Sequence, residues 1–258
     1  MKYLICSGDS FTDQYHRSQP HPELDTSWPK WPELLGERLN MKVINAGGSG
    51  QGNEYIYSTI QDVIESIEDK SQIGLIIAAW SECARNDFQT GIGNPNEDRD
   101  GWNSESIDRT GNILGWVKRS LRLFKNLEYM CQYYDIPYIQ FQMIPLFVDY
   151  LKYHSSSKFP GTRIFKHKPY SQYYDLILKK IIEYEKILDI SKFIGWPGVE
   201  ELGGFTFNYE LLGDVGLSSM EDQYKFGLTI SKLDAHPNAA GQVKIAEYLY
   251  DRLDVNVL

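Results

Sequence analysis

The feature that most constrains the fold is an alternation of short apolar runs with longer segments of helical periodicity. The runs have the length and composition of buried β-strands and cover residues 2–6, 41–44, 73–79 and 138–141. Apolar residues spaced for one face of a helix predict helices over residues 31–39, 54–67, 114–134, 173–188 and 239–253. Strands joined through helices need crossover connections, so the pattern predicts an α/β fold with a central parallel sheet.

Length and composition are those of a single domain over residues 1–258. With 42% hydrophobic and 24% charged residues, the chain resembles ordinary globular proteins rather than disordered or fibrous ones. Three stretches fit the alternation poorly and are expected to be insertions: residues 90–112, 146–172 and 193–230. Residues 151–174 carry five basic residues and no acidic one, which suits a lid, a contact with an anionic polymer or a solvated loop.

Charge and hydropathy narrow the class of partner. A net charge of -9 at pH 7 repels a phosphate backbone on average, which argues against a nucleic-acid partner. No run approaches the ~20 apolar residues that span a bilayer, and the first run is too short for a signal peptide, so we expect a cytoplasmic protein without a membrane span. The cysteines lack the spacing of a metal site and are expected to be structural thiols: Cys6, Cys83 and Cys131. We expect neither a metal nor another cofactor.

The first candidate for chemistry is Ser10, in the turn Gly8-Asp9-Ser10-Phe11 that ends the first predicted strand. The carboxyl ends of the strands in an open α/β sheet border the binding crevice, so a serine at this place meets a ligand. Its hydroxyl is a weak nucleophile until a base accepts the proton. Because Gly-Asp-Ser is also a common turn tripeptide, the interpretation needs a histidine that reaches Ser10.

The candidate base is His236, in the segment 234–238 just before the last predicted helix. Asp234 is placed to hold the imidazole in the tautomer that offers a free nitrogen to Ser10. The alternative is a capping loop with an incidental histidine, because Asn238 can cap the helix that follows.

A glycine-rich turn at residues 45–50 follows the second predicted strand. Esterase chemistry needs main-chain N–H groups aimed at the oxygen that becomes negative, and glycine lets the backbone come that close. Gly50 is the candidate donor. Such a turn also suits a phosphate group, but its spacing is not that of a dinucleotide-binding loop and no lysine follows as in a P-loop.

Together the three segments resemble the GDSL/SGNH hydrolase family, whose four sequence blocks contribute a serine, a glycine, an asparagine and a histidine in that order. The blocks that match are residues 8–11, 45–50 and 234–237. The resemblance implies a flavodoxin-like three-layer α/β/α fold and ester hydrolysis through an acyl-serine intermediate. It also implies that the N–H groups of Ser10 and Gly50 form the oxyanion hole.

Two features depart from the family pattern. Ser81 stands where the family's asparagine donor aligns, and Asn86 is the alternative about one helical turn later. The family acid usually lies three residues before the histidine, whereas Asp234 lies two residues before His236. A Ser-His dyad is the alternative if Asp234 does not orient the imidazole.

Three further residues near the predicted site are candidates for substrate contact: Trp80, Arg85 and Trp196. Arg85 either reaches an anionic substrate or pairs with Glu82 at the surface. Trp196 and the aromatic residues after it either stack on a sugar or pack inside an insertion. Two histidines lie in the loop after the nucleophile turn: His16 and His21. They either line the entrance of the site or are solvated, and we expect them to be solvated because they lack a metal-ligand pattern.

The sequence therefore predicts a serine esterase that hydrolyses a carboxylic ester through an acyl-Ser10 intermediate. From the family analogy and the supply of aromatic side chains, the substrate is expected to be a small-molecule or carbohydrate ester with a short acyl group, such as acetyl. Two alternatives stay open. One is an acyltransferase on the same site, and the other is a carbohydrate-binding or structural module without efficient catalysis. The oligomeric state is left undetermined.

Overall fold

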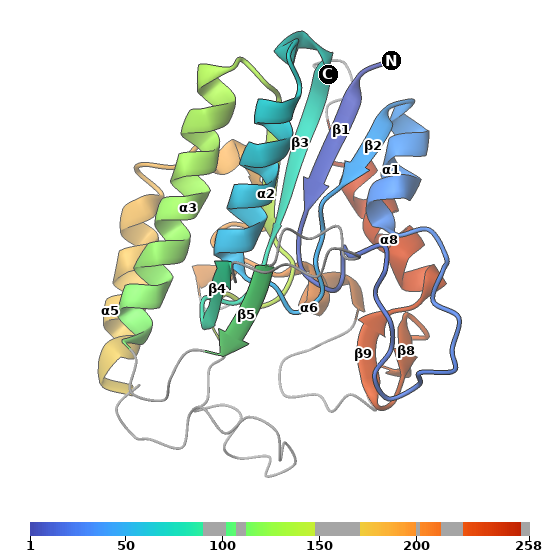
Figure 1. Cartoon of the computed structure of the whole chain (residues 1–258). Coiled ribbons are helices and arrows are strands. Elements are labelled where there is room, and N and C mark those ends of the chain that lie inside the picture. Colours follow the sequence, from blue (N-terminus) through green and yellow to red (C-terminus); the bar gives the residue numbers. More distant parts are fainter. Residues whose placement is uncertain (90–101, 107–111, 148–170, 200–201, 213–223, 254–258) are drawn as a thin grey trace.

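The computed structural model describes residues 1–89, 102–106, 112–147, 171–199, 202–212 and 224–253 (Figure 1). Its main sheet has five strands in the order β2-β1-β3-β6-β7, and every neighbouring pair is parallel. The strands are β1 (Tyr3–Ser7), β2 (Lys42–Asn45), β3 (Ile73–Trp80), β6 (Tyr138–Gln142) and β7 (Phe193–Ile194). The first four end within one residue of the predicted bounds.

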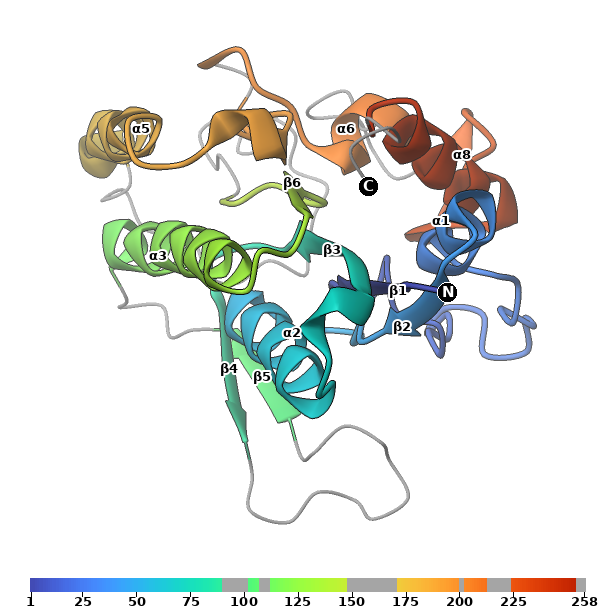
Figure 2. The ribbon, with the colours of Figure 1, turned by 90° about the horizontal axis from the view of Figure 1, so that it is seen from above.

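Helices cover both faces of this sheet. On one face lie α2 (Asn53–Ser66), α3 (Ile113–Tyr133) and α5 (Ser171–Tyr184), and on the other lie α1 (Trp31–Leu39), α6 (Phe207–Leu212) and α8 (Ala239–Tyr250) (Figure 2). Short 3₁₀ helices at Lys70–Gln72 and Ile190–Lys192 lead into β3 and β7. The strand order, counted along the sheet, is that of flavodoxin-like folds.

The central strand β3 explains why the sequence signal for a buried sheet is strong. All eight of its residues are buried. Alternate residues enter two separate apolar clusters: Ile76, Ala78 and Trp80 pack with α2, α3 and α5, and Leu75, Ile77 and Ala79 pack with α1, α6 and α8. Successive side chains of a strand point to opposite faces, so a strand between two helical layers is apolar throughout. The predicted three-layer α/β/α fold with a central parallel sheet is confirmed.

Two antiparallel hairpins stand outside the main sheet. β4 (Arg85–Gln89) pairs with β5 (Trp102–Ser106), and β8 (Thr229–Ser231) pairs with β9 (Asp234–Pro237). β8 and β9 lie beside the loop that follows β1 (Figure 1). The second hairpin therefore brings the segment with His236 to the side of the molecule where Ser10 lies.

The predicted insertions contain regular elements that the periodicity did not indicate. β5 lies inside the stretch 90–112, and β7 and α6 lie inside 193–230, while β8 begins inside that stretch and ends at Ser231. These elements have two to six residues, which is too short to show a helical or strand period. Of the stretch 146–172, residues 148–170 lie outside the described residues, and with them the basic side chains of the segment 151–174.

The carboxyl ends of the first three strands meet at one edge of the sheet. Ser10 follows β1, Gly50 follows β2 and Arg85 follows β3. The chain passes from β1 to β2 on one side and then returns across β1 to β3 on the other. Such a reversal of direction is where open α/β sheets form their binding crevice, so the fold itself collects the candidate residues.

The N-terminus of α2 is capped by a residue from β4. Gly52, the N-cap residue, has no side chain to accept a hydrogen bond, and Asp87 takes that role. Its carboxylate accepts hydrogen bonds from Gly52 N–H over 2.7 Å and from Tyr55 N–H over 3.0 Å. A carboxylate at a helix N-terminus satisfies unpaired donors and interacts favourably with the helix dipole. This contact fastens the Arg85-bearing strand to the helix behind Gly50.

In the part of the chain that the structure describes, no helix combines the length and the apolar character needed to cross a membrane.

We expect Asp87→Ala to lower the free energy of unfolding by about 1–3 kcal/mol, because two helix N–H groups lose a charged acceptor. Urea denaturation measured by circular dichroism gives the value. Asn86→Ala is the matched control. The Asn86 side chain is exposed, so its removal should change the free energy of unfolding by less than about 0.5 kcal/mol. Equal losses for the two variants would contradict the capping role.

Candidate active site

The turn after β1 presents Ser10 at the sheet edge. The main-chain carbonyl of Asp9 accepts hydrogen bonds from the N–H groups of Thr12 (2.9 Å) and Asp13 (3.1 Å). The side-chain carboxylate of Asp9 accepts one from Phe11 N–H (3.1 Å). An aspartate that binds the backbone two residues ahead in this way is typical of an Asx turn. The turn holds the backbone on both sides of Ser10, whose side chain lines a surface cavity.

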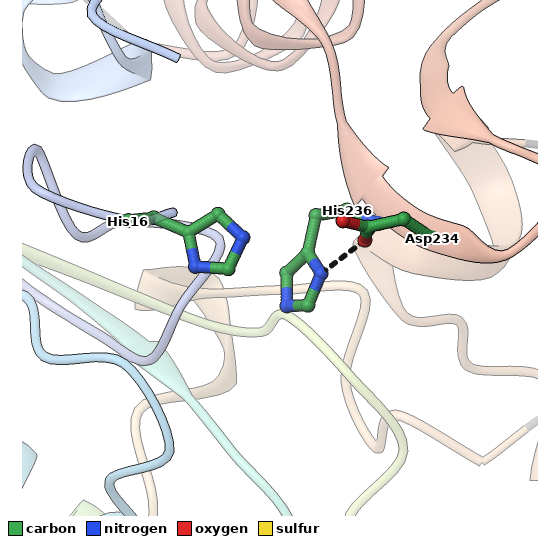
Figure 3. A group of neighbouring side chains, drawn as sticks. All are labelled: His16, Asp234 and His236. Carbon is green, nitrogen blue, oxygen red and sulfur yellow. Dashed lines mark hydrogen bonds and ion pairs between the residues drawn. The ribbon is translucent and has the colours of Figure 1, made fainter. Parts of the chain in front are cut away.

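His236 reaches Ser10 from β9. The Ser10 hydroxyl donates to His236 Nε2 over 2.8 Å. Figure 3 shows the second bond, in which His236 Nδ1–H donates to Asp234 Oδ1 over 2.5 Å. The main-chain N–H of His236 donates to the same carboxylate oxygen over 3.0 Å. This network assigns the proton to Nδ1 and leaves Nε2 as an acceptor, which is the tautomer that a general base needs. The fold thus brings together three residues that the sequence singles out from distant segments.

The Asp234 carboxylate is buried and hydrogen-bonded at both oxygens. Ser18 Oγ–H donates to Oδ2 over 2.5 Å, while Oδ1 accepts the two bonds from His236. Burial alone would raise the pKa of this carboxyl, but the hydrogen bonds from His236 and Ser18 outweigh burial and hold the pKa well below its usual range. Asp234 is therefore ionised at neutral pH and can stabilise an imidazolium on His236.

Two contacts hold the C-terminal elements against the loop that follows β1. Gln242 on α8 donates through Nε2 to the Phe11 carbonyl over 3.1 Å and accepts from Trp31 N–H over 2.9 Å. His21 Nε2 and Ser231 Oγ of β8 are hydrogen-bonded over 2.6 Å. His21 was expected to be solvated, and instead its ring binds the hairpin that carries His236.

His16 packs against the imidazole of His236, with ring centroids 4.0 Å apart and the planes 35° from parallel (Figure 3). Because the Ser49 hydroxyl donates to Asp13 over 2.6 Å, His16 Nδ1–H must donate to Ser49 Oγ over 3.0 Å. Burial and the neighbouring His236 lower the pKa of His16 to about 4, so this ring is neutral at neutral pH. The expectation that His16 is solvated is therefore wrong. Its neutral ring packs against His236 instead.

Among the residues described, one group has the spacing of metal ligands: His16, Asp234 and His236, with one ligand atom each within 4.8 Å of the others (Figure 3). Both ring nitrogens of His236 and both carboxylate oxygens of Asp234 are already hydrogen-bonded. A metal ion at this place would have to break the bonds that join Ser10, His236 and Asp234. The arrangement therefore favours proton transfer over metal binding.

The glycine-rich turn after β2 lies beside Ser10 and offers a main-chain donor. Gly50 has φ of 78°, a left-handed conformation that favours glycine, and it lines the same cavity as Ser10. A Cβ at Gly47 would lie 2.8 Å from the carbonyl carbon of Thr12, so glycine there lets the two turns touch. Within the described ranges, the N–H groups of Ser10 and Gly50 donate to no protein atom. Both are thus open to an oxyanion.

Neither side chain predicted as the third oxyanion donor lines this cavity. Ser81 is fully buried, and its hydroxyl donates to Asp9 Oδ2 over 3.0 Å. Asn86 lies on β4 with an exposed side chain whose Oδ1 accepts from Arg119 over 3.1 Å. The structure gives Ser81 a role in holding the turn after β1 and places Asn86 on the surface of the hairpin.

The two tryptophans predicted to contact substrate also lie away from the cavity. Trp80 is fully buried, donates through Nε1 to Gln140 over 3.0 Å and packs on Phe124 with ring centroids 4.7 Å apart. Trp196 is partly buried in the same apolar cluster and lies edge-on to Phe193, 5.1 Å between centroids. For both, packing in this apolar cluster replaces the expected contact with substrate.

A cavity of about 730 Å³ opens over the site. Its volume lies in the range of small-molecule binding sites, roughly 300–1,000 Å³. The lining includes Ser10, His16, Gly50, Arg85, Asp234 and His236. Tyr15 and Leu233 also line it, with 68% and 65% of their surfaces exposed. Arg85 is the one predicted contact residue, of the three, that the structure places at the cavity.

The cysteines lie apart from this chemistry. Cys6, Cys83 and Cys131 are buried and form no disulfide. Burial raises the pKa of the Cys131 thiol to about 12 and also raises those of Cys6 and Cys83. All three are protonated at neutral pH and are poor nucleophiles.

Sequence reasoning missed three residues that shape the site: His16, Ser18 and Gln242. Ser18 lies 216 positions from the carboxylate that it binds, so no local motif could indicate the contact. Gln242 sits on an amphipathic helix whose other buried positions are apolar, and a polar residue there was the available signal. For His16 the signal was its position six residues after Ser10, which was too general to assign a role.

No protein-family model matches the sequence, and a comparison with curated protein sequences finds no match. Solved structures align with nearly the whole chain. A G-D-S-L family protein from Desulfitobacterium hafniense DCB-2 is 16% identical over 98% of this chain and 100% of that chain, with a TM-score of 0.48. The psychrotrophic esterase EstA from Pseudoalteromonas sp. is 14% identical over 98% and 96%, with a TM-score of 0.46. A member of the lipolytic protein G-D-S-L family from Veillonella parvula DSM 2008 is 14% identical over 98% and 100%, with a TM-score of 0.44.

We expect the stabilising effect of Asp234 to depend on pH. Since the pKa of Asp234 is lowered by folding from a reference value of 3.8, the ionised carboxylate stabilises the fold above that value, and the effect is lost as the pH falls through the folded-state pKa. The difference in unfolding free energy between wild type and Asp234→Asn should stay constant at neutral pH and shrink below about pH 4. Urea denaturation at a series of pH values measures it.

Ser18→Ala removes one of the hydrogen bonds that lower this pKa. The difference in unfolding free energy between wild type and Ser18→Ala should follow the same pH trend and be smaller in size. The stabilising role of ionised Asp234 would be refuted by one result. In it, the difference in unfolding free energy between wild type and Asp234→Asn stays the same from neutral pH to the lowest pH at which the protein is folded.

Proposed function

We propose that this protein is a serine carboxylesterase, with Ser10 as nucleophile, His236 as general base and Asp234 as the residue that orients the imidazole. The observation that carries the proposal is the unbroken hydrogen-bond chain from Ser10 Oγ through both nitrogens of His236 to Asp234 Oδ1, with bonds of 2.8 and 2.5 Å. Its outer end lines a cavity of about 730 Å³, so an ester can reach the hydroxyl. A serine hydroxyl becomes a strong nucleophile beside a base of this kind.

In the first half-reaction, Ser10 Oγ attacks the carbonyl carbon of the ester while His236 Nε2 accepts the hydroxyl proton. The carbonyl oxygen becomes an oxyanion, which the N–H groups of Ser10 and Gly50 are proposed to bind. The tetrahedral intermediate collapses as the bond from carbon to the alcohol oxygen breaks. His236 gives its proton to that oxygen, so the products are a free alcohol and acyl-Ser10.

In the second half-reaction, water takes the place of the alcohol. His236 Nε2 accepts a proton from the water as its oxygen attacks the acyl carbon, and the bond to Ser10 Oγ then breaks and Oγ regains the proton. Asp234 stays ionised and stabilises the imidazolium in both halves. Because the pKa of His16 is lowered to about 4, the ring packed on His236 adds no positive charge that would oppose this imidazolium.

For the substrate we propose a short acyl ester, such as acetyl, of a carbohydrate or another small polar alcohol. The exposed ring of Tyr15 lines the cavity and supplies a flat apolar surface of the kind that sugar rings pack against. Arg17 and Gln19 line the same cavity and can hydrogen-bond hydroxyl groups. Transfer of the acyl group to a sugar would use the same residues, and a rise in turnover with added sugar acceptor would identify the transferase alternative.

The nucleophile assignment predicts that a fluorophosphonate probe labels Ser10 covalently and that Ser10→Ala abolishes labelling. Ester turnover should fall by a factor on the order of 10⁴ to 10⁶ in Ser10→Ala, because the acyl-enzyme can no longer form. Ser71→Ala, at a serine in the 3₁₀ helix before β3, is the matched control and should keep wild-type labelling. Intact-protein mass spectrometry reads the label, and an unlabelled wild type would point to a binding module.

The proposed substrate class predicts a preference for short acyl groups. In a series of 4-nitrophenyl esters, kcat/KM should be highest for acetyl and decrease steadily toward octanoyl. Acetylated sugars should release acetate in the presence of wild type and not of Ser10→Ala. A maximum at octanoyl would contradict the substrate class while leaving the nucleophile assignment in place.

A further inference from the structure

We infer that Arg85 is a catalytic residue whose guanidinium supplies the third donor to the oxyanion. The inference rests on the proposed esterase function. It replaces the side-chain donors expected from the sequence, because Ser81 and Asn86 do not line the cavity whereas Arg85 does. Arg85 stands at the first position of β4, in the connection that leaves the carboxyl end of β3.

The guanidinium is held between the two turns that carry the other donors. Nη1 donates to the carbonyl of Gln51, the residue after Gly50, over 2.7 Å. It also lies 3.5 Å from the carboxylate of Asp9, the residue before Ser10. The guanidinium is therefore bound to the residue before Ser10 and to the residue after Gly50, next to both proposed main-chain donors.

One edge of the guanidinium is left for a ligand. Nε donates to Glu82 over 3.0 Å and Nη1 makes the two contacts just described, whereas Nη2 donates to no atom of the described residues. The Arg85 side chain is 19% exposed and lines the cavity with Ser10. A fixed arginine with an unused N–H edge suits an oxyanion, since a charge-assisted hydrogen bond is stronger than a neutral one.

Glycine at position 52 allows the arginine to approach. A Cβ at Gly52 would lie 2.6 Å from Arg85 Cβ, closer than two such atoms come in proteins. Any other residue there would push β4 away from the turn that carries Gly50. The close packing and the Asp87 contacts with Gly52 and Tyr55 fix the start of β4 relative to the oxyanion donors.

Charge balance gives the second reason for an arginine. The buried carboxylate of Asp9 directly precedes the nucleophile, and its negative charge opposes the formation of an oxyanion nearby. The guanidinium offsets this charge while it donates to the developing one. A neutral side chain such as asparagine would supply the hydrogen bond but would not offset the negative charge of Asp9.

The test compares Arg85→Met, Arg85→Lys and the matched control Arg38→Met with a neutral ester, 4-nitrophenyl acetate. Arg38 pairs with Glu247 at the surface, away from the cavity lining. Arg85→Met should lower kcat by about 10²- to 10³-fold, as loss of an oxyanion donor does, with KM little changed. Arg85→Lys should recover part of the loss, and Arg38→Met should keep wild-type kinetics. An unchanged kcat with a raised KM, or an effect seen only with negatively charged esters, would show substrate recognition instead and would overturn the inference.

A second variant separates donation from charge neutralisation. Arg85→Met leaves Asp9 with an uncompensated charge, which the double variant Asp9→Asn/Arg85→Met removes. If Arg85 donates to the oxyanion as well as offsetting the charge of Asp9, the double variant should recover only part of the lost turnover and stay well below wild type. Recovery to wild-type turnover in the double variant would mean that Arg85 acts only by neutralising Asp9, and the inference would fail.

Labelling by the fluorophosphonate probe distinguishes failure of this inference from failure of the esterase proposal. A wild type that is labelled at Ser10, with Arg85→Met labelled at the same rate and turning over ester equally fast, would refute the role of Arg85 alone. A wild type that is neither labelled nor active would refute the esterase function and the inference with it. Slower labelling of folded Arg85→Met, with urea denaturation as the check on folding, is the expected result.

Discussion

The hydrogen bond between Ser10 Oγ and His236 Nε2 is the interaction on which the rest of the site depends. It joins residues 226 positions apart. One partner is delivered by the end of β1, and the other by a hairpin outside the main sheet. Two contacts fix the position of the hairpin relative to the turn after β1. Gln242 binds the backbone of that turn, and His21 binds β8. The proposed chemistry of the site therefore depends on the packing of the layers, because no single segment contains both the proposed nucleophile and the proposed base.

Buried carboxylates surround this bond, and each has several donors. Asp9 is bound by Phe11 N–H and the Ser81 hydroxyl, and Asp234 by His236 and Ser18. An uncompensated charge in such a place is strongly destabilising, so these donors are required for the fold as well as for the geometry. The carboxylates in turn fix the turn after β1 and the tautomer of His236. Stability and preorganisation thus come from the same hydrogen bonds.

The parts of the fold with a strong local period could be predicted from the sequence, and contacts between distant loops could not. β3 is apolar throughout because helices cover both its faces, so its sequence signal is direct. Ser10 and Gly50 follow predicted strands, and their meeting at one edge follows from the parallel sheet, whereas the hairpin that brings His236 to them was not predicted. The strands β7 and β8 are too short to show a period. The role of Ser81 was assigned by its alignment position and that of Trp80 by its place near the predicted site. Neither tells whether a side chain points to the cavity or to the core.

The separation of Ser10 from His236 has a consequence for the chain during its synthesis. A ribosome-bound chain that has reached residue 230 already contains the proposed nucleophile and all five strands of the main sheet, but it lacks the proposed base. Its serine is chemically inert, because an unassisted hydroxyl is a poor nucleophile. Reactivity arises only when the last hairpin and α8 have been made and have docked. Under the proposed mechanism, acyl transfer would therefore require that β9 and α8 have been made and have docked, and a chain that stops before β9 would not attack esters.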